Sequence, residues 1–348
     1  MMACHTTIGS GNTQLLLPAP APFSLQSIAV NPELSKPVLQ LIATGDVSGS
    51  EVGSSGLVSK YVTAAIAYST RRAYRQDLQD FLAWGGTIPA SPEVVAAYVA
   101  ERAQTQTVAT LTRRVVGIGR AHVSQGLPDS TKTDLVRTVL RGVRRVNGAA
   151  QRRVNPLVKR DLMEMVACMD GVRGARERAL LLMGFCAALR RSELAALQVE
   201  DVEMVREGMV VNIRKSKTDQ DALGRKIAIP WSRQSVCPVQ ALNQWLDAAK
   251  ITSGPIFRAI DRADHVATQQ LSAQSIALII KGYACQVGLD QAKFSGHSLR
   301  AGFVTSAIQA GVAVHKIQQQ TGHKSVEMLS RYIRDASLFD GNASGAIL

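Results

Sequence analysis

An apolar stretch in the middle of the chain ends abruptly at a pair of charged residues. The run Leu180–Leu189 is almost wholly apolar, Arg190 follows it, and Glu193 comes three residues later. A core helix ending in this way would hold the guanidinium still, and Glu193 could orient it or a neighbouring base. A fixed guanidinium suits a bidentate oxyanion. The alternative is an ordinary capping salt bridge.

A second basic segment lies between two predicted strands. Met209–Ile213 and Lys226–Ile229 are rich in strand-forming residues and predict a hairpin. Lys215 and Lys217 lie in the connection, on one face by period-two alternation. A lysine at a hairpin tip is usually only solvated, so this segment alone indicates no function.

The segment Ser295–Gly302 predicts the start of a helix with His297 and Arg300 in its first turn. Free amide groups and the positive helix end favour an anion there. The imidazole adds a proton donor or acceptor, and the guanidinium adds a bidentate donor. The predicted buried stripe consists of Leu299, Phe303, Ala307 and Ala310.

A fourth segment joins two predicted helices at a glycine. Gly322 ends the first helix, His323 follows, and Tyr332 lies 9 residues after His323 in the second helix, in which Met328 and Leu329 are predicted to face inward. Taken alone, the segment better fits a helix-turn-helix reader in which Tyr332 is a core or groove residue.

Composition indicates what these segments could bind. The chain has 40 Lys+Arg against 27 Asp+Glu, a net charge of +13, which favours a polyanion, nucleic acid first. The five cysteines are odd in number and far apart, as expected of free thiols in a reducing cytoplasm. No metal-ligand cluster, phosphate loop, secretory signal or bilayer-spanning run occurs, so we expect no metal, no cofactor and no membrane partner.

The pattern of residue types divides the chain into five parts. Residues 1–55 are rich in Gly, Ser, Pro and Thr and predict a flexible arm, with a short helix near Pro32–Thr44. Helical periodicity covers 56–146, a small and basic linker spans 147–156, and a second, mixed domain spans 157–340 before a tail at 341–348.

Basic residues dominate the predicted outer faces of the first domain. Tyr74, Leu78 and Phe81 form the inner face of one helix, which places Asp77 outside with the arginines. Because few acids are interspersed, we expect contact with a DNA backbone rather than a merely solvated face. The candidates are Arg71, Arg72, Arg113, Arg114, Arg120, Lys132 and Arg144.

In their order along the chain, the four segments resemble the active site of the tyrosine recombinase (phage integrase) family. The resemblance covers most of residues 58–340. It implies a mainly α (α+β) fold, with an N-terminal helical core-binding (SAM-like) domain and a C-terminal catalytic domain that contains a small antiparallel β-sheet.

The resemblance also implies roles for the individual residues. Tyr332 would attack the scissile phosphate, giving a 3′-phosphotyrosyl link and a free 5′-hydroxyl without ATP. Arg190 and Arg300 would clamp the nonbridging oxygens, and His323 would hydrogen-bond the phosphate. Lys217, with Lys215 as the alternative, would protonate the leaving 5′-oxygen. His297 would assist proton transfer at the tyrosine, and Glu193 would hold these groups in register.

The resemblance implies double-stranded DNA sites as the partner. It also implies that four protomers act together on two such sites and that the protein is a monomer in free solution. The exchange would serve integration, excision or resolution of a mobile element or plasmid. The apolar residues of the tail, Leu338, Phe339, Ile347 and Leu348, either dock on a neighbouring protomer or form a frayed end. A type IB topoisomerase shares this chemistry, and a DNA-binding regulator without catalysis is the other alternative.

Overall fold

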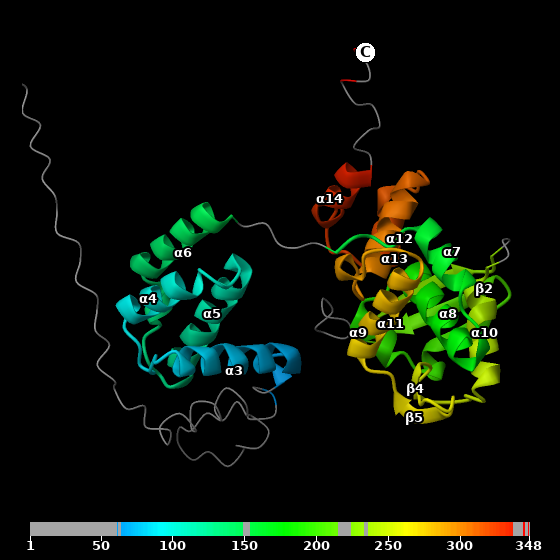
Figure 1. Ribbon diagram of the computed structural model, residues 1–348, viewed down its shortest axis with the longest axis horizontal. Coiled ribbons are helices and arrows are strands. Elements are labelled where there is room, and N and C mark those ends of the chain that lie inside the picture. The colour runs from blue at the N-terminus through cyan, green and yellow to red at the C-terminus, as the bar shows by residue number, and fades with distance from the viewer. Residues whose placement is uncertain are drawn as a thin grey trace, which may run out of the picture. The chain divides into compact units, whose positions relative to one another are not determined.

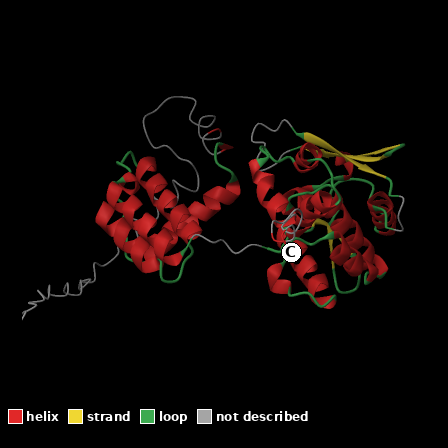
Figure 2. Cartoon of the chain, turned by 90° about the horizontal axis from the view of Figure 1, so that it is seen from above, coloured by secondary structure: helices red, strands yellow, loops and turns green. Residues whose placement is uncertain are grey.

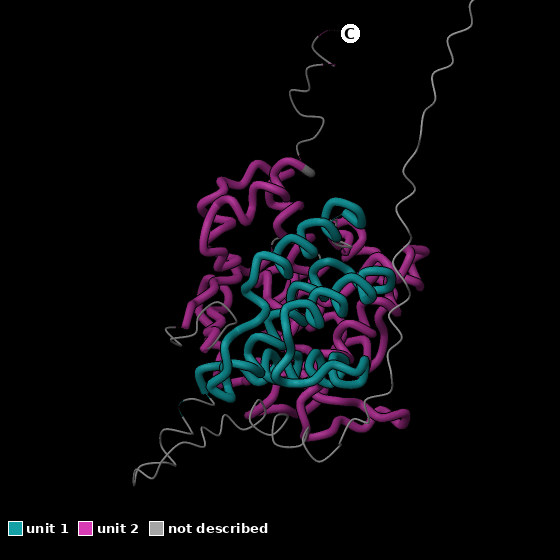
Figure 3. Tube along the Cα trace, turned by 90° about the vertical axis from the view of Figure 1, so that its left-hand side faces the viewer, with its two compact units in different colours: residues 1–151 teal, residues 152–348 magenta. Residues whose placement is uncertain are grey.

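The computed structural model describes residues 61, 64–148, 154–214, 224–232, 236–336, 344 and 347. The chain forms two compact units, residues 1–151 and 152–348 (Figure 3), and the division lies inside the predicted linker 147–156. The predicted arm at 1–55, Lys215, Lys217 and nearly all of the tail lie outside the described residues. Among the described helices, none is long and apolar enough to cross a bilayer.

The described part of the first unit consists of helices alone. Its elements are α3 (Tyr68–Ala83), α4 (Pro92–Arg102), α5 (Val108–Ser124), the short 3-10 helix η1 (Ser130–Lys132) and α6 (Asp134–Asn147). The helices α4 and α5 begin where the Ser91 and Thr107 side chains cap them, by accepting hydrogen bonds from the Val94 and Thr110 amides. Leu78, Phe81 and Tyr98 are fully buried in the core between these helices.

Asp77 corrects the predicted outer face of α3. Its side chain is buried rather than exposed, and its two carboxylate oxygens accept hydrogen bonds from Arg113 at 2.8 and 2.9 Å. Arg114 approaches the same carboxylate at 3.8 Å and pairs with Asp80 at 2.7 Å. A buried carboxylate needs such partners, and they lie on α5, 36 residues away in the sequence.

Helices also dominate the second unit (Figure 1). They are α7 (Lys159–Ala167), α8 (Gly171–Cys186), α9 (Arg191–Ala196), α10 (Pro238–Ala248), α11 (Ala273–Gln286), α12 (Ser298–Gln309), α13 (Val314–Thr321) and α14 (Glu327–Ala336), with the 3-10 helices η2 (Val199–Asp201) and η3 (Gln291–Lys293). Leu180, Leu181 and Met183 of α8 have no exposed surface or almost none, so α8 is the central core helix that its apolar run predicts.

Two small antiparallel sheets complete the second unit (Figure 2). The predicted hairpin is confirmed as β2 (Gly208–Ile213) paired with β3 (Arg225–Pro230), and β1 (Val202–Val205) adds a third strand on β2. The strands β4 (Arg258–Ile260) and β5 (Val266–Gln270) form the second sheet. The sequence analysis missed β1, β4 and β5, which are short and contain few β-branched residues at alternating positions.

The segment that enters the second unit packs directly on α12. The Leu157 amide donates to the Ser298 carbonyl at 2.9 Å, and the Lys159 amide donates to the Ser306 hydroxyl at 3.1 Å. Gly302 permits this approach, because a Cβ at that position would lie 1.7 Å from the Leu157 carbonyl oxygen. Residues 157–159 therefore brace α12, whose N-cap residue is His297.

Candidate active site

Arg190 lies where the core helix gives way to α9. After α8, Ala188 adopts the left-handed conformation (φ 49°), and Arg190 becomes the N-cap residue of α9. Glu193 is 7 % exposed; its carboxylate accepts the Arg190 amide at 2.9 Å and the Arg190 Nη1 at 2.7 Å. The capping salt bridge considered from the sequence is therefore present, and it fixes the guanidinium.

His297 and Arg300 lie at the start of α12, as their spacing predicts. His297 is the N-cap residue, and Arg300 is only 2 % exposed. The Arg300 Nη1 donates to the carbonyl of Ala188 at 2.7 Å, which ties α12 to the end of α8. In the predicted stripe Leu299 is buried, Phe303 and Ala307 are half-buried, and Ala310 is exposed because α12 ends at Gln309.

His323 is held from both sides of its ring. Gly322 ends α13 in the left-handed conformation that glycine favours, and this turn carries His323 toward Arg300. The Arg300 Nη2 lies 3.2 Å from Nε2, and the Thr321 hydroxyl lies 2.7 Å from Nδ1. Because an arginine can only donate, Nε2 accepts, and a neutral ring then carries its proton on Nδ1.

Tyr332 comes from α14 and faces His297. Its hydroxyl lies 3.3 Å from the His297 Nε2, although the two residues are 35 positions apart in the chain. The tyrosine ring packs at the edge of a small cluster formed by Val304, Ile317 and Leu329 of α12, α13 and α14. Leu329 is buried as predicted, whereas Met328 is exposed because it falls on the opposite side of α14.

Arg225 is a site residue that the sequence analysis missed. It opens β3, and its Nη2 donates to Glu193 at 3.2 Å while its Nη1 donates to the Gln320 carbonyl at 2.9 Å. Arg225 belongs to none of the four segments singled out in the sequence. Its position just after the connection that carries Lys215 and Lys217 was the one feature of the sequence that could have indicated a role in the site. Arg190 and Arg225 thus bind one carboxylate, and Arg300 lies close enough to feel its charge, so positive charge is in surplus here.

This surplus charge shifts the titration of the nearby groups. Burial and the neighbouring guanidiniums lower the pKa of His323 to about 4 and that of Arg300 to about 10, so near neutral pH the imidazole is neutral and the guanidinium charged. Desolvation and the same arginines also lower the pKa of His297. The site therefore favours an anion, with an uncharged imidazole beside a tyrosine hydroxyl.

The structure brings together six of the predicted site residues, which come from three separate segments of the sequence: Arg190, Glu193, His297, Arg300, His323 and Tyr332. The two candidate lysines lie outside the described residues. In the first unit Arg72, Arg120, Lys132 and Arg144 are exposed and Arg71 is half-buried. The Arg113 side chain is half-exposed, whereas that of Arg114 is 13 % exposed and holds α5 to α3.

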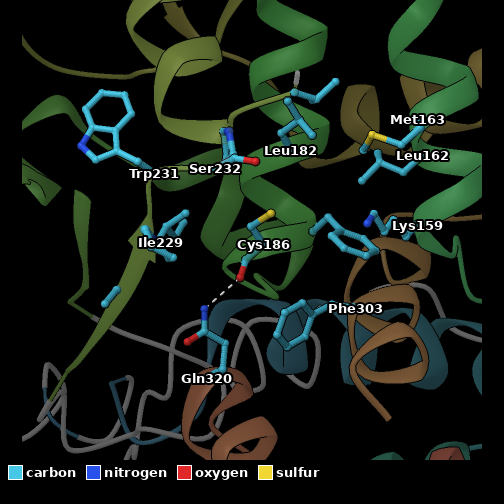
Figure 4. Close-up of a pocket in the computed structure, with 15 residues that line it drawn as sticks. Lys159, Leu162, Met163, Leu182, Cys186, Ile229, Trp231, Ser232, Phe303 and Gln320 are labelled. Carbon is cyan, nitrogen blue, oxygen red and sulfur yellow. Dashed lines mark hydrogen bonds between the residues drawn. The ribbon is translucent and has the colours of Figure 1, made fainter. Parts of the chain in front are cut away.

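A separate, mainly apolar pocket of about 440 Å³ lies in the second unit (Figure 4). Its walls include Leu162, Phe185, Trp231 and Phe303, and none of the predicted catalytic residues lines it. At its edge the Gln320 side chain donates to the Cys186 carbonyl at 2.9 Å. The cavity thus adjoins the end of α13 without opening among the site's charged groups.

Comparison with known proteins identifies a family and individual relatives that are similar to this chain in sequence. The phage integrase family matches residues 156–338. An integrase/recombinase XerD homolog of Selenomonas ruminantium is 40% identical over 80% of this chain and 84% of its own length. The recombinase Cre of Escherichia phage P1 is 26% identical over 71% of this chain and 77% of its own length.

A solved structure agrees at the level of the fold. The XerH site-specific recombinase in a post-cleavage complex with a palindromic difH substrate covers 87% of this chain and 90% of its own, with a TM-score of 0.57 and 14% identity. The mainly helical fold with small antiparallel sheets is thereby confirmed. The family match over more than half of the chain and the 40% identical relative show that the protein belongs to the phage integrase family of tyrosine recombinases.

Proposed function

We propose that this protein is a site-specific recombinase that cleaves and rejoins DNA strands through a covalent bond between Tyr332 and a 3′-phosphate. The observation that carries the proposal is the convergence of a tyrosine hydroxyl and a neutral imidazole, 3.3 Å apart, with a group of fixed guanidiniums. This combination supplies a nucleophile, a proton acceptor and an oxyanion site.

The proposed reaction begins with attack of the Tyr332 oxygen on the scissile phosphorus. The P–O bond to tyrosine forms, the tyrosine proton passes to His297, and the bond to the 5′-oxygen breaks. Lys217, or Lys215 as the alternative, protonates that departing oxygen. Attack of a 5′-hydroxyl on the phosphotyrosine reverses these steps and rejoins a strand.

The surrounding groups stabilise the phosphate during this exchange. Arg190 and Arg300 bind the nonbridging oxygens, where negative charge develops in the transition state, and His323 adds a hydrogen bond. Glu193 holds Arg190 in place through the two contacts to its amide and its guanidinium. A carboxylate that holds an arginine in this way reduces the reorganisation needed when the phosphate arrives.

The partner in this proposal is double-stranded DNA, bound by a helical core-binding domain (56–146) and a catalytic domain (157–340). The XerH relative in the structural comparison is bound to its difH substrate. Arg114 forms ion pairs with Asp77 and Asp80 inside the first unit and is no longer a candidate for DNA contact. The remaining candidates for contact with the DNA backbone are Arg71, Arg72, Arg113, Arg120, Lys132 and Arg144. Four protomers would act on two sites, with a monomer in free solution, to integrate, excise or resolve a mobile element or plasmid.

The test is to trap the covalent intermediate. The protein is incubated with nicked DNA that carries candidate sites from its own genetic neighbourhood, and wild type is compared with Tyr332→Phe on a denaturing gel. We expect a slowly migrating protein–DNA band in wild type alone. Tight, specific DNA retention without a band would favour a regulator, and supercoil relaxation without strand exchange would favour a topoisomerase.

A further inference from the structure

Arg225 touches two parts of the site that are far apart in the sequence. Its side chain is 19% exposed, and its guanidinium lies between Glu193 of α9 and the carbonyl of Gln320 at the end of α13. The two partners are 32 and 95 residues away from Arg225. One side chain therefore connects the element that carries Arg190 with the turn that carries His323.

The Glu193 carboxylate is shared between two arginines. Its Oε1 accepts the Arg190 Nη1, and its Oε2 accepts both the Arg190 amide and the Arg225 Nη2. Because the Glu193 side chain is only 3% exposed, water cannot readily replace a lost partner. Removing Arg225 would leave Oε2 with one fewer donor and free the carboxylate, and with it Arg190, to change orientation.

On its other side, Arg225 packs against the turn at Gly322. A Cβ on Gly322 would lie 2.8 Å from the Arg225 Nη1, so the glycine and the guanidinium are in close contact. Gln320, which accepts the Arg225 bond through its carbonyl, is itself tied to the Cys186 carbonyl through its side chain (Figure 4). The turn before His323 is thus fixed to α8 and β3 at once.

Arg225 also contributes charge to the site. Its positive charge helps to lower the pKa values of Arg300 and His323, which shows that its field reaches both groups. Burial lowers the pKa of Arg225 itself, while Glu193 opposes that shift. With Arg225 present, two guanidiniums bind the Glu193 carboxylate; without it, only that of Arg190 does.

We propose that Arg225 is a positioning residue for the phosphate clamp. Through Glu193 it sets the orientation of Arg190, and through the Gln320–Gly322 turn it sets the place of His323. This inference rests on the proposed recombinase function, in which Arg190 and His323 bind the scissile phosphate. Arg225 acts through these neighbours and does not itself contact the reacting atoms.

The first experiment compares Arg225→Gln and Arg225→Lys with wild type in single-turnover formation of the covalent adduct. We expect each variant to lose on the order of 10- to 100-fold in rate, because a displacement of about 1 Å in a clamp residue has an effect of this size. DNA affinity should stay within about twofold, since backbone contacts dominate it. Arg178→Gln is the matched control, because that half-buried arginine donates to the carbonyls of Val166 and Met169 instead.

A substrate with a neutral methylphosphonate at the scissile position separates positioning from folding. It lacks the negative charge that the clamp neutralises, so the deficit of Arg225→Gln should shrink on this substrate. An equal deficit on both substrates, or a rate within about twofold of wild type on ordinary DNA, would overturn the proposal. If circular dichroism shows that Arg225→Gln is unfolded, the same criteria are applied to Arg225→Lys. That variant keeps the positive charge but cannot bind Glu193 and the Gln320 carbonyl at once.

A double-mutant cycle with Glu193→Gln separates action through Glu193 from direct phosphate contact. If Arg225 acts through Glu193, the double variant should be little slower than the slower single variant. Fully additive losses would instead show that Arg225 does not act through Glu193, which contradicts that part of the proposed role. Failure of wild type itself to form any adduct would refute the recombinase function and is therefore distinguishable from failure of this inference.

Discussion

The Nη2 of Arg300 lies 3.2 Å from the Nε2 of His323, and the imidazole accepts this hydrogen bond. On its other ring nitrogen His323 contacts Thr321, whose hydroxyl also lies 2.7 Å from the Ile317 carbonyl. The free protein therefore presents no Nε2–H to a phosphate. To donate a hydrogen bond there, His323 must leave Arg300 and carry a proton on Nε2, either by taking one up or by a change of tautomer.

Phosphate binding should accordingly be linked to proton uptake at His323. The pKa of His323 is about 4 in the free protein, so the ring is unprotonated near pH 7, and a phosphate anion beside it raises that pKa. We expect titration calorimetry in buffers of different ionisation enthalpy to show net proton uptake when a Tyr332→Phe protein binds its DNA site. The uptake should disappear in His323→Trp, whose indole is a donor at every pH.

The exposed His315 of α13, the helix that ends just before His323, provides the control for this linkage. A His315→Gln variant should retain the uptake. Equal proton counts for the Tyr332→Phe protein with and without His323→Trp would show that His323 stays neutral on the phosphate.

The rate of adduct formation should fall in acid because of His297. Desolvation, Arg300 and Arg190 lower the pKa of His297 below its usual 6.5, so the neutral ring that accepts the Tyr332 proton persists to below pH 6.5 and is lost as the pH falls further. His297→Gln should slow adduct formation by roughly 10²- to 10⁴-fold and flatten this acid limb. Single-turnover rates between pH 5 and 8 test this, and an unchanged acid limb in the variant would assign it to another group.

Gly302→Ala should destabilise the catalytic unit. The added Cβ would lie 1.7 Å from the Leu157 carbonyl oxygen, so the backbone at 155–159 must move away from α12, at an expected loss of about 1–3 kcal/mol in unfolding free energy. Gly282→Ala in α11 is the matched control: nothing lies within 4 Å of its added Cβ, and a gain of roughly 0.5–1 kcal/mol is expected. Urea unfolding measures both, and equal midpoints would contradict the close approach.

The exposed arginines of the first unit should determine the salt dependence of DNA binding. Arg72→Gln and Arg144→Gln should each reduce the slope of log K against log salt concentration by about 0.9, the effect of one phosphate contact. Arg206→Gln, at an exposed position between β1 and β2, should leave the slope unchanged. If the plots of log K against log salt concentration had the same slope for all three variants and wild type, Arg72 and Arg144 would not contact the DNA.

The core helix α8, the β2–β3 hairpin and most of the site residues could be predicted from the sequence alone. The helices that start at Pro92 and Val108 each follow directly on a capping residue, Ser91 or Thr107. The apolar run after Ala179 predicts a buried helix that ends near Arg190. These signals are local, because propensity, capping and periodicity act over a few residues. The order of Arg190, His297, Arg300, His323 and Tyr332 was likewise enough to indicate the family.

Tertiary structure decided which side chains meet and in what state. The burial of Asp77 depends on Arg113, the place of Arg225 depends on Gln320, and the Arg300 contact with Ala188 spans 112 residues. Such contacts form between distant segments, and periodicity says nothing about partners at that range. The lowered pKa values of His297 and His323 arise in the same way, because desolvation and neighbouring charge exist only once the chain has folded around them.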